Sequence, residues 1–187
     1  MFARPDLQSR FILTTAAFIA EVLHLGWEYS HGGVPAHHLL NNPDMPAVSN
    51  WWGLLVVPLL VWFLVGRIQR RAATLVQIGS RERFRTLARA RFAVALLWAG
   101  ALALAFTLGH PAVTWIFFGA FAAAVCAGAW RAEYVLGFAL GMSFTFGAVL
   151  PVLVASTIAA CAFAVHLVCG AVLRLARGGR VRGAGLP

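Results

Sequence analysis

The sequence contains no lysine, and charged residues of any kind make up only 11% of its 187 positions, whereas 61% are hydrophobic. So few charges leave too little polar surface for a soluble fold of this size. A mean hydropathy of +0.81 is instead typical of a polytopic membrane protein. The composition therefore excludes soluble folds and predicts an all-α integral membrane protein with a single transmembrane domain.

Cysteine is scarce as well. Cys126, Cys161 and Cys169 all lie within apolar runs and form no CxxC motif. This pattern excludes a disulfide framework and a dithiol redox centre, and we expect the three side chains to be buried.

The net charge of +9 arises from 15 arginines against six acidic residues. A charge of this size on a soluble surface would suggest a nucleic-acid partner, but no nucleic-acid-binding motif accompanies it. We therefore expect no nucleic-acid partner and expect the arginines to mark connections between membrane spans.

Six apolar stretches are long enough to cross about 30 Å of hydrocarbon at about 1.5 Å per residue. The last two form one continuous apolar run, which we divide at Gly147–Pro151 because it is too long for a single crossing. The predicted spans lie near residues 11–31, 51–67, 91–109, 112–130, 132–150 and 152–174.

Arginine is distributed unevenly among the connections. The segment 67–91 contains eight arginines and the connection 32–50 contains none, while a Gly/Arg-rich tail, residues 178–187, closes the chain. Short arginine-rich connections remain on the cytoplasmic side. The distribution predicts six spans with both termini cytoplasmic and the 32–50 loop extracytoplasmic. We expect the tail to be disordered and the protein to lie in a plasma membrane, such as a bacterial inner membrane.

Ionisable side chains are concentrated between residues 21 and 50, which hold four of the six histidines and three of the six acidic residues. Glu21, His24, Glu28 and His31 are spaced by three, four and three residues, so they share a helix face about 60° wide. Ionisable groups inside a membrane are costly and usually face partners or a water-filled cavity. The pattern predicts a polar site at the outer end of the first span.

Imidazole and carboxylate ligands together suit a divalent transition metal, and we expect zinc or iron. The predicted ligands are Glu28 and His31, joined by His37 or His38 from the loop. Two glycines directly after His31 would let the backbone turn back over the helix end. Such a site would have three or four ligands and an open position for water.

Deeper groups of the same face have supporting roles in this hypothesis. His24 is a further ligand or orients Glu28. Glu21 lies about 15 Å below His31 by helix rise and is expected to relay protons or to pair with another buried group, such as His166. Further candidate residues for the site are His110, His166, Asp44 and Asn50.

The function that this pattern favours is a metal-dependent membrane enzyme, a hydrolase of a lipid or another amphipathic small molecule. A bound ion would lower the pKa of its water towards neutrality, with Glu28 or Glu21 as general base. The expected partners are membrane lipids and the substrate.

Other function classes stay open. A haem iron clamped by histidines of different spans would indicate a redox protein. A proton or cation pathway through Glu21, His24 and Glu28 would indicate a coupled transporter, although spans three to five carry few ionisable groups to complete it. An accessory subunit, with the polar stripe holding helices together, is the remaining class.

Overall fold

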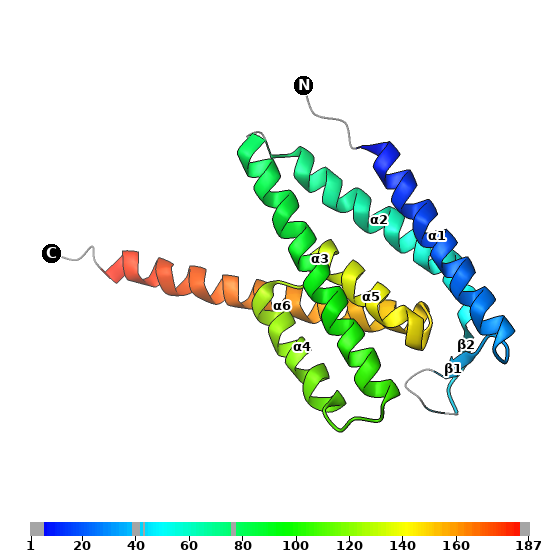
Figure 1. Cartoon of the computed structure of the whole chain (residues 1–187). Coiled ribbons are helices and arrows are strands. Elements are labelled where there is room, and N and C mark those ends of the chain that lie inside the picture. Colours follow the sequence, from blue (N-terminus) through cyan, green and yellow to red (C-terminus); the bar gives the residue numbers. More distant parts are fainter. Residues whose placement is uncertain (1–5, 39–41, 43, 76–77, 184–187) are drawn as a thin grey trace.

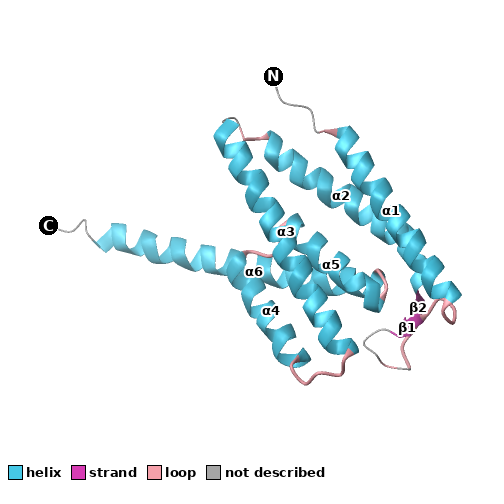
Figure 2. Cartoon of the chain, viewed as in Figure 1, coloured by secondary structure: helices cyan, strands magenta, loops and turns pink. Residues whose placement is uncertain are grey.

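The structure is a computed structural model that describes residues 6–38, 42, 44–75 and 78–183. Within these residues the fold is all-α, with six helices and a short hairpin between the first two (Figures 1 and 2). In chain order the elements are α1 (Leu7–Ser30), β1 (Ala36–His38), β2 (Ala47–Ser49), the 3₁₀ helix η2 (Asn50–Trp52), α2 (Gly53–Ala73), α3 (Ile78–Thr107), α4 (Val113–Ala127), α5 (Ala132–Phe146) and α6 (Val149–Gly183).

Four of the described helices are long and apolar enough to cross a membrane. They are α1, η2 with α2, α3 and α6. Helices α4 and α5 have 15 residues each and are apolar, but at about 1.5 Å per residue they reach only about 22 Å. The prediction of a helical membrane fold is confirmed, whereas a count of six complete crossings stays a prediction.

The arginine-rich segment 67–91 is mostly helical. Helix α2 continues to Ala73 and α3 begins at Ile78, so the connection is much shorter than the loop predicted from the sequence. Arginine is a good helix former, and no proline interrupts this segment. Most of its arginines therefore extend the ends of two helices.

The long apolar run near the C-terminus is divided at Gly147. Helix α5 ends at Phe146, Gly147 has a φ of 66°, which favours glycine, and α6 begins at Val149. Helix α6 then continues through Gly183, so residues 178–183 are helical where the sequence suggested a disordered tail. No proline follows Pro151 until the last residue, so nothing forces an earlier helix end. Residues 184–187 of that tail lie outside the described residues.

Small residues bring α3 and α5 close together. Gly137 and Gly141 of α5, one turn apart, lie against the backbone of α3 at Phe92 and Leu96 and against the methyl groups of Ala95 and Ala99. A glycine at every fourth position lets two membrane helices approach at the backbone, where van der Waals contact replaces the missing hydrophobic drive. This contact is the centre of the largest buried apolar cluster.

The helices leave many large apolar side chains facing outward. Leu97 and Trp115 are 72% and 80% exposed, and all three cysteines are exposed, contrary to the expected burial. In a membrane these surfaces contact lipid, which is as apolar as a protein core, so the cysteines need no cover from neighbouring helices. The second half of α6 extends away from the other helices (Figure 1).

Adding a methyl group at the α3–α5 contact should destabilise the fold. In Gly137→Ala or Gly141→Ala the new Cβ would overlap an α3 backbone carbonyl, and we expect a loss of about 1–3 kcal/mol in unfolding free energy. Thermal unfolding of the detergent-solubilised protein measures it. The matched control is Gly100→Ala, whose added methyl meets nothing within 4 Å, so the unfolding midpoint should not fall. An equal loss in the control would contradict the packing argument.

Candidate functional site

The inward face of α1 is mostly polar. Apart from Ser9 and Leu25, the described residues of α1 that are not exposed follow one series with spacings of four and three residues. We call this series the polar stripe; its members are Arg10, Thr14, Ala17, Glu21, His24 and Glu28. The opposite face carries exposed apolar side chains such as Phe11 and Leu23. Helix α1 therefore presents polar groups to the protein and apolar groups to the lipid.

Helix α2 provides room for the charged members of the stripe. The Glu21 carboxylate lies against Gly53, and the Arg10 guanidinium lies against Gly66, where any side chain would collide with it. Arg10 Nε also donates a hydrogen bond of 2.8 Å to the backbone carbonyl of Trp62, and its guanidinium covers the Trp62 ring at 3.8 Å. The two glycines fix α1 and α2 as antiparallel neighbours.

His24 lies between two buried carboxylates. Its Nδ1 is 3.9 Å from Glu21 Oε2, and its Nε2 is 3.4 Å from Glu28 Oε1. Glu21 and Glu28 are 6% and 8% exposed, and the imidazole stacks on the Phe144 ring of α5 at 4.7 Å. Each ring nitrogen therefore faces a different carboxylate at a distance slightly longer than a hydrogen bond.

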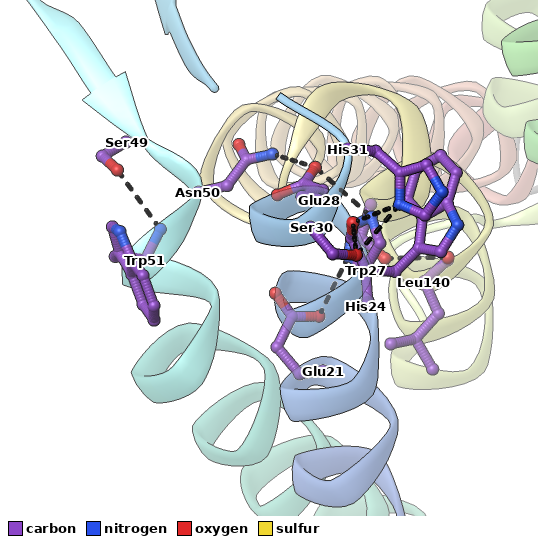
Figure 3. A network of polar contacts seen from close by, with 11 residues as sticks. Glu21, His24, Trp27, Glu28, Ser30, His31, Ser49, Asn50, Trp51 and Leu140 are labelled. Atoms are coloured by element: carbon purple, nitrogen blue, oxygen red, sulfur yellow. Dashed lines mark hydrogen bonds and ion pairs between the residues drawn. The ribbon is translucent and has the colours of Figure 1, made fainter. Parts of the chain in front are cut away.

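Asn50, the first residue of η2, orients Glu28. Its Nδ2 donates a hydrogen bond of 2.8 Å to Glu28 Oε1, and the residue is only 4% exposed (Figure 3). The other end of the amide, Oδ1, lies against Gly147 at the turn between α5 and α6. Asn50 thereby joins α1, α2 and the α5–α6 turn, and its side chain does more than begin a helix.

Two buried atoms of this network have no hydrogen-bond partner in the described part of the chain: His24 Nε2 and Glu28 Oε2. Buried polar atoms are nearly always paired, so such an atom needs an explanation. A proton or a metal ion at Glu28 and His24 would satisfy both atoms. The site is therefore suited to bind a cation.

His31 does not take part in this network, contrary to the predicted helix face. Helix α1 ends at Ser30, and His31 is the C-cap with non-helical φ and ψ angles of −114° and 30°. Its Nδ1 lies 2.8 Å from the Trp27 carbonyl and 3.0 Å from Ser30 Oγ, and its ring stacks on Trp27 (Figure 3). The helical spacing no longer applies at the cap, so the exposed ring turns away from Glu28.

His37 and His38 lie on the hairpin that the predicted loop forms. Strand β1 pairs antiparallel with β2, placing His37 opposite Val48 and His38 opposite Ala47. His38 Nδ1 is bound to the Met45 carbonyl at 2.8 Å. Both histidines line a cavity of about 300 Å³ against α3, α5 and α6. They do not come back over Glu28 because the two glycines after His31 lead the chain into a strand.

The remaining predicted residues lie apart from one another. His110 Nδ1 accepts a hydrogen bond from the Ala112 backbone in the α3–α4 turn. His166 is exposed, and its ring lies tilted against that of Trp130, with the ring centroids 4.4 Å apart, which gives it a partner other than Glu21. Asp44 belongs to a turn in which its backbone N–H donates to Asn42 Oδ1.

A buried acid that the sequence analysis missed lies elsewhere in the bundle. Glu133, in the first turn of α5, is 1% exposed, and neither carboxylate oxygen has a hydrogen-bond partner among the described residues. Acidic residues favour the first turn of a helix because of the helix dipole. That position, two residues after Arg131, was the signal available in the sequence.

The described residues do not bring three metal-ligating side chains to one point. Glu28, His31 and the hairpin histidines do not converge. Within the polar stripe, an ion bound to His24 Nε2 would reach Glu28, and one bound to Nδ1 would reach Glu21. The donor set thus offers two protein ligands to a single ion, fewer than the three or more that zinc sites use.

The chain matches no known protein-family model, no curated protein and no solved structure.

Removing the Asn50 amide should leave the Glu28 carboxylate without its hydrogen-bond donor. Asn50→Ala is expected to lower the free energy of unfolding by about 1–3 kcal/mol, because a buried carboxylate oxygen loses its donor. The loss should shrink in a Glu28→Ala background, giving a coupling energy of about 0.5–3 kcal/mol in a double-mutant cycle. Asn42→Ala is the comparison, because it removes only an exposed turn bond to the Asp44 backbone and should lower the free energy of unfolding by less than Asn50→Ala does. Strictly additive effects of Asn50→Ala and Glu28→Ala would show that the bond contributes nothing.

Proposed function

We propose that the protein is a proton-coupled membrane protein in which Glu21, His24 and Glu28 bind and relay protons. The observation that carries the proposal is the position of the His24 ring, with each nitrogen facing a different buried carboxylate. An imidazole can accept a proton at one nitrogen and release one from the other. Two carboxylates on opposite sides of the ring are the acceptors and donors that this exchange needs.

The charges of the cluster favour proton binding. With both glutamates ionised and His24 neutral, the cluster would carry two negative charges in a water-poor interior, which is costly. Arg10 is the nearest basic side chain of the polar stripe and lies about 16 Å away by helix rise. One bound proton leaves a single negative charge, and two leave none. The cluster is therefore stable when it holds at least one proton.

A single transfer can be written with every proton accounted for. Protonated Glu28 gives its carboxyl proton to His24 Nε2, and the resulting imidazolium passes its Nδ1 proton to the Glu21 carboxylate. His24 ends neutral as the other tautomer, so the net change is one proton moved from Glu28 to Glu21. Asn50 donates to Glu28 Oε1, the oxygen that lies 3.4 Å from His24 Nε2, and so holds the carboxyl group beside the ring. The present gaps must shorten to about 2.7–3.0 Å for each step.

The direction of this path follows from the polar stripe. Glu28 lies near the hairpin, and Thr14 and Arg10 continue the stripe towards the other end of α1, with Ala17 as its only apolar member. We further propose that the hairpin faces the extracytoplasmic side of a plasma membrane and that both termini face the cytoplasm, as the arginine distribution favours.

Proton flux into liposomes tests the proposal. The full chain is reconstituted with an internal pH-sensitive dye, and a potassium diffusion potential drives proton entry. Wild-type liposomes should acidify faster than empty ones. His24→Gln and Glu28→Gln should each slow this flux at least tenfold, since positioned acid–base groups contribute about 10²–10⁴-fold to proton transfer.

His31→Gln is the matched control, because His31 lies next to the site but turns away from it. Its flux should equal that of the wild type. Wild-type liposomes no more permeable than empty ones, or an equal loss in His31→Gln, would contradict the relay.

A metal-dependent enzyme is the second candidate, favoured by the unpaired His24 Nε2 and Glu28 Oε2. These two residues would hold a zinc or iron ion, with further ligands from water or substrate. Such an ion would activate water for hydrolysis of a lipid or another amphipathic molecule. Glu21 would then act as general base. A haem centre is not proposed, because the described neighbours of His24 are carboxylates and Phe144.

Elemental analysis of protein purified without chelator separates the two candidates. The metal hypothesis predicts one equivalent of zinc or iron in the wild type, lost in Glu28→Ala and His24→Ala and retained in His31→Ala. Wild-type protein that carries no metal and still conducts protons would leave the relay as the function of the site.

A further inference from the structure

Helix α1 begins, α2 ends and α3 begins at the end of the bundle opposite the hairpin (Figure 1). Side chains from these three helix ends line a groove. It encloses about 450 Å³ and is lined by both polar and apolar side chains of these three helices. The relay cluster lies on the other half of α1, so this groove is separate from the proposed function.

One side of the groove is basic. Arg81, Arg85 and Arg89 recur every four residues and therefore share one side of α3. Arg81 donates to the Leu75 carbonyl at 3.3 Å, and its Nε is buried without a hydrogen-bond partner in the described residues. Arg85 makes an exposed ion pair of 3.2 Å with Glu82, the kind of pair that contributes little. The guanidinium groups are thus available to an anion.

The opposite side presents polar groups that are already engaged with one another. Gln69 Nε2 donates to the Asp6 carbonyl at 2.9 Å and to Ser9 Oγ at 3.0 Å. The Ser9 backbone N–H donates to the Asp6 carboxylate, which holds the pKa of Asp6 below its usual value. Asp6 caps α1 in this way, so it does not neutralise the arginines by a direct ion pair. The lining keeps a net charge of +2.

Apolar side chains complete the groove. Leu13 of α1, Ile68 of α2, and Phe84 and Ala88 of α3 lie beside the arginines. A free phosphate ion would contact the arginines but would leave these apolar side chains without a partner. An amphiphile with an anionic head and a hydrocarbon chain matches both parts of the lining.

We propose that this groove binds an anionic phospholipid. The phosphate lies between Arg85 and Arg89, within reach of Arg81, and the first part of an acyl chain follows Leu13, Ile68 and Phe84. Arginine suits the phosphate because its planar group can donate two parallel hydrogen bonds. If these apolar helices cross the membrane, their ends, and the groove between them, lie at the level of the lipid headgroups.

Lipid titration followed by native mass spectrometry tests the proposal. The full chain in detergent is mixed with phosphatidylglycerol or with phosphatidylcholine, and bound lipid is counted. Wild-type protein should retain one phosphatidylglycerol and prefer it to phosphatidylcholine. Arg85→Gln/Arg89→Gln should weaken binding about 30-fold, since each basic group near an anionic lipid contributes roughly fivefold.

Matched variants make the result specific. Arg67→Gln/Arg83→Gln removes two arginines that do not line the groove and should bind phosphatidylglycerol as the wild type does. Arg85→Lys/Arg89→Lys retains the charge and should recover part of the affinity, which separates charge loss from misfolding. The proposal is wrong if both double glutamine variants lose affinity equally or if phosphatidylcholine binds as well. Displacement of the lipid by inorganic phosphate at equal concentration would show an anion site without lipid specificity and would also overturn it.

Discussion

The structure depends on the cost of keeping two carboxylates and an imidazole away from water. Glu21, His24 and Glu28 lie in a helix whose other faces are apolar, so their partners must come from the protein. Helix α2 supplies a glycine that admits Glu21, and η2 supplies the asparagine amide that binds Glu28. The close α1–α2 contact follows from this requirement, because an exposed polar stripe would face hydrocarbon.

Helices α3, α5 and α6 support the α1–α2 contact from its other side. The glycines of α5 allow close packing on α3, and the α5–α6 turn at Gly147 lies against the Asn50 amide. Phe144, three residues earlier, covers the His24 ring. The tight α3–α5 pair therefore positions Gly147 against Asn50 and Phe144 against His24. Neither helix contributes an ionisable group to the cluster.

Much of the fold and about half of the site could be predicted from the sequence. Apolar length and the Gly147–Pro151 signal indicated the helices and the break, and helical spacing placed Glu21, His24 and Glu28 on one face. His31 was misplaced because periodicity cannot show where a helix ends, and the cap changed its direction. The hairpin at residues 36–49 was missed because its strands have three residues each, too few for alternation to be recognised. The structural role of Asn50 depends on a hydrogen bond to Glu28, 22 residues earlier in the chain. Helical spacing cannot reveal such a long-range contact.

The pairing of α1 with α2 also bears on how the chain enters the membrane. Arg10, Glu21 and Glu28 all find their partners between Asn50 and Gly66, in the next helix to be synthesised. The first two helices can therefore leave the insertion machinery as an antiparallel pair in which these charged side chains already face α2 and not lipid. The nascent protein needs no later helix to shield them, and only the covering of His24 by Phe144 waits for the second half of translation.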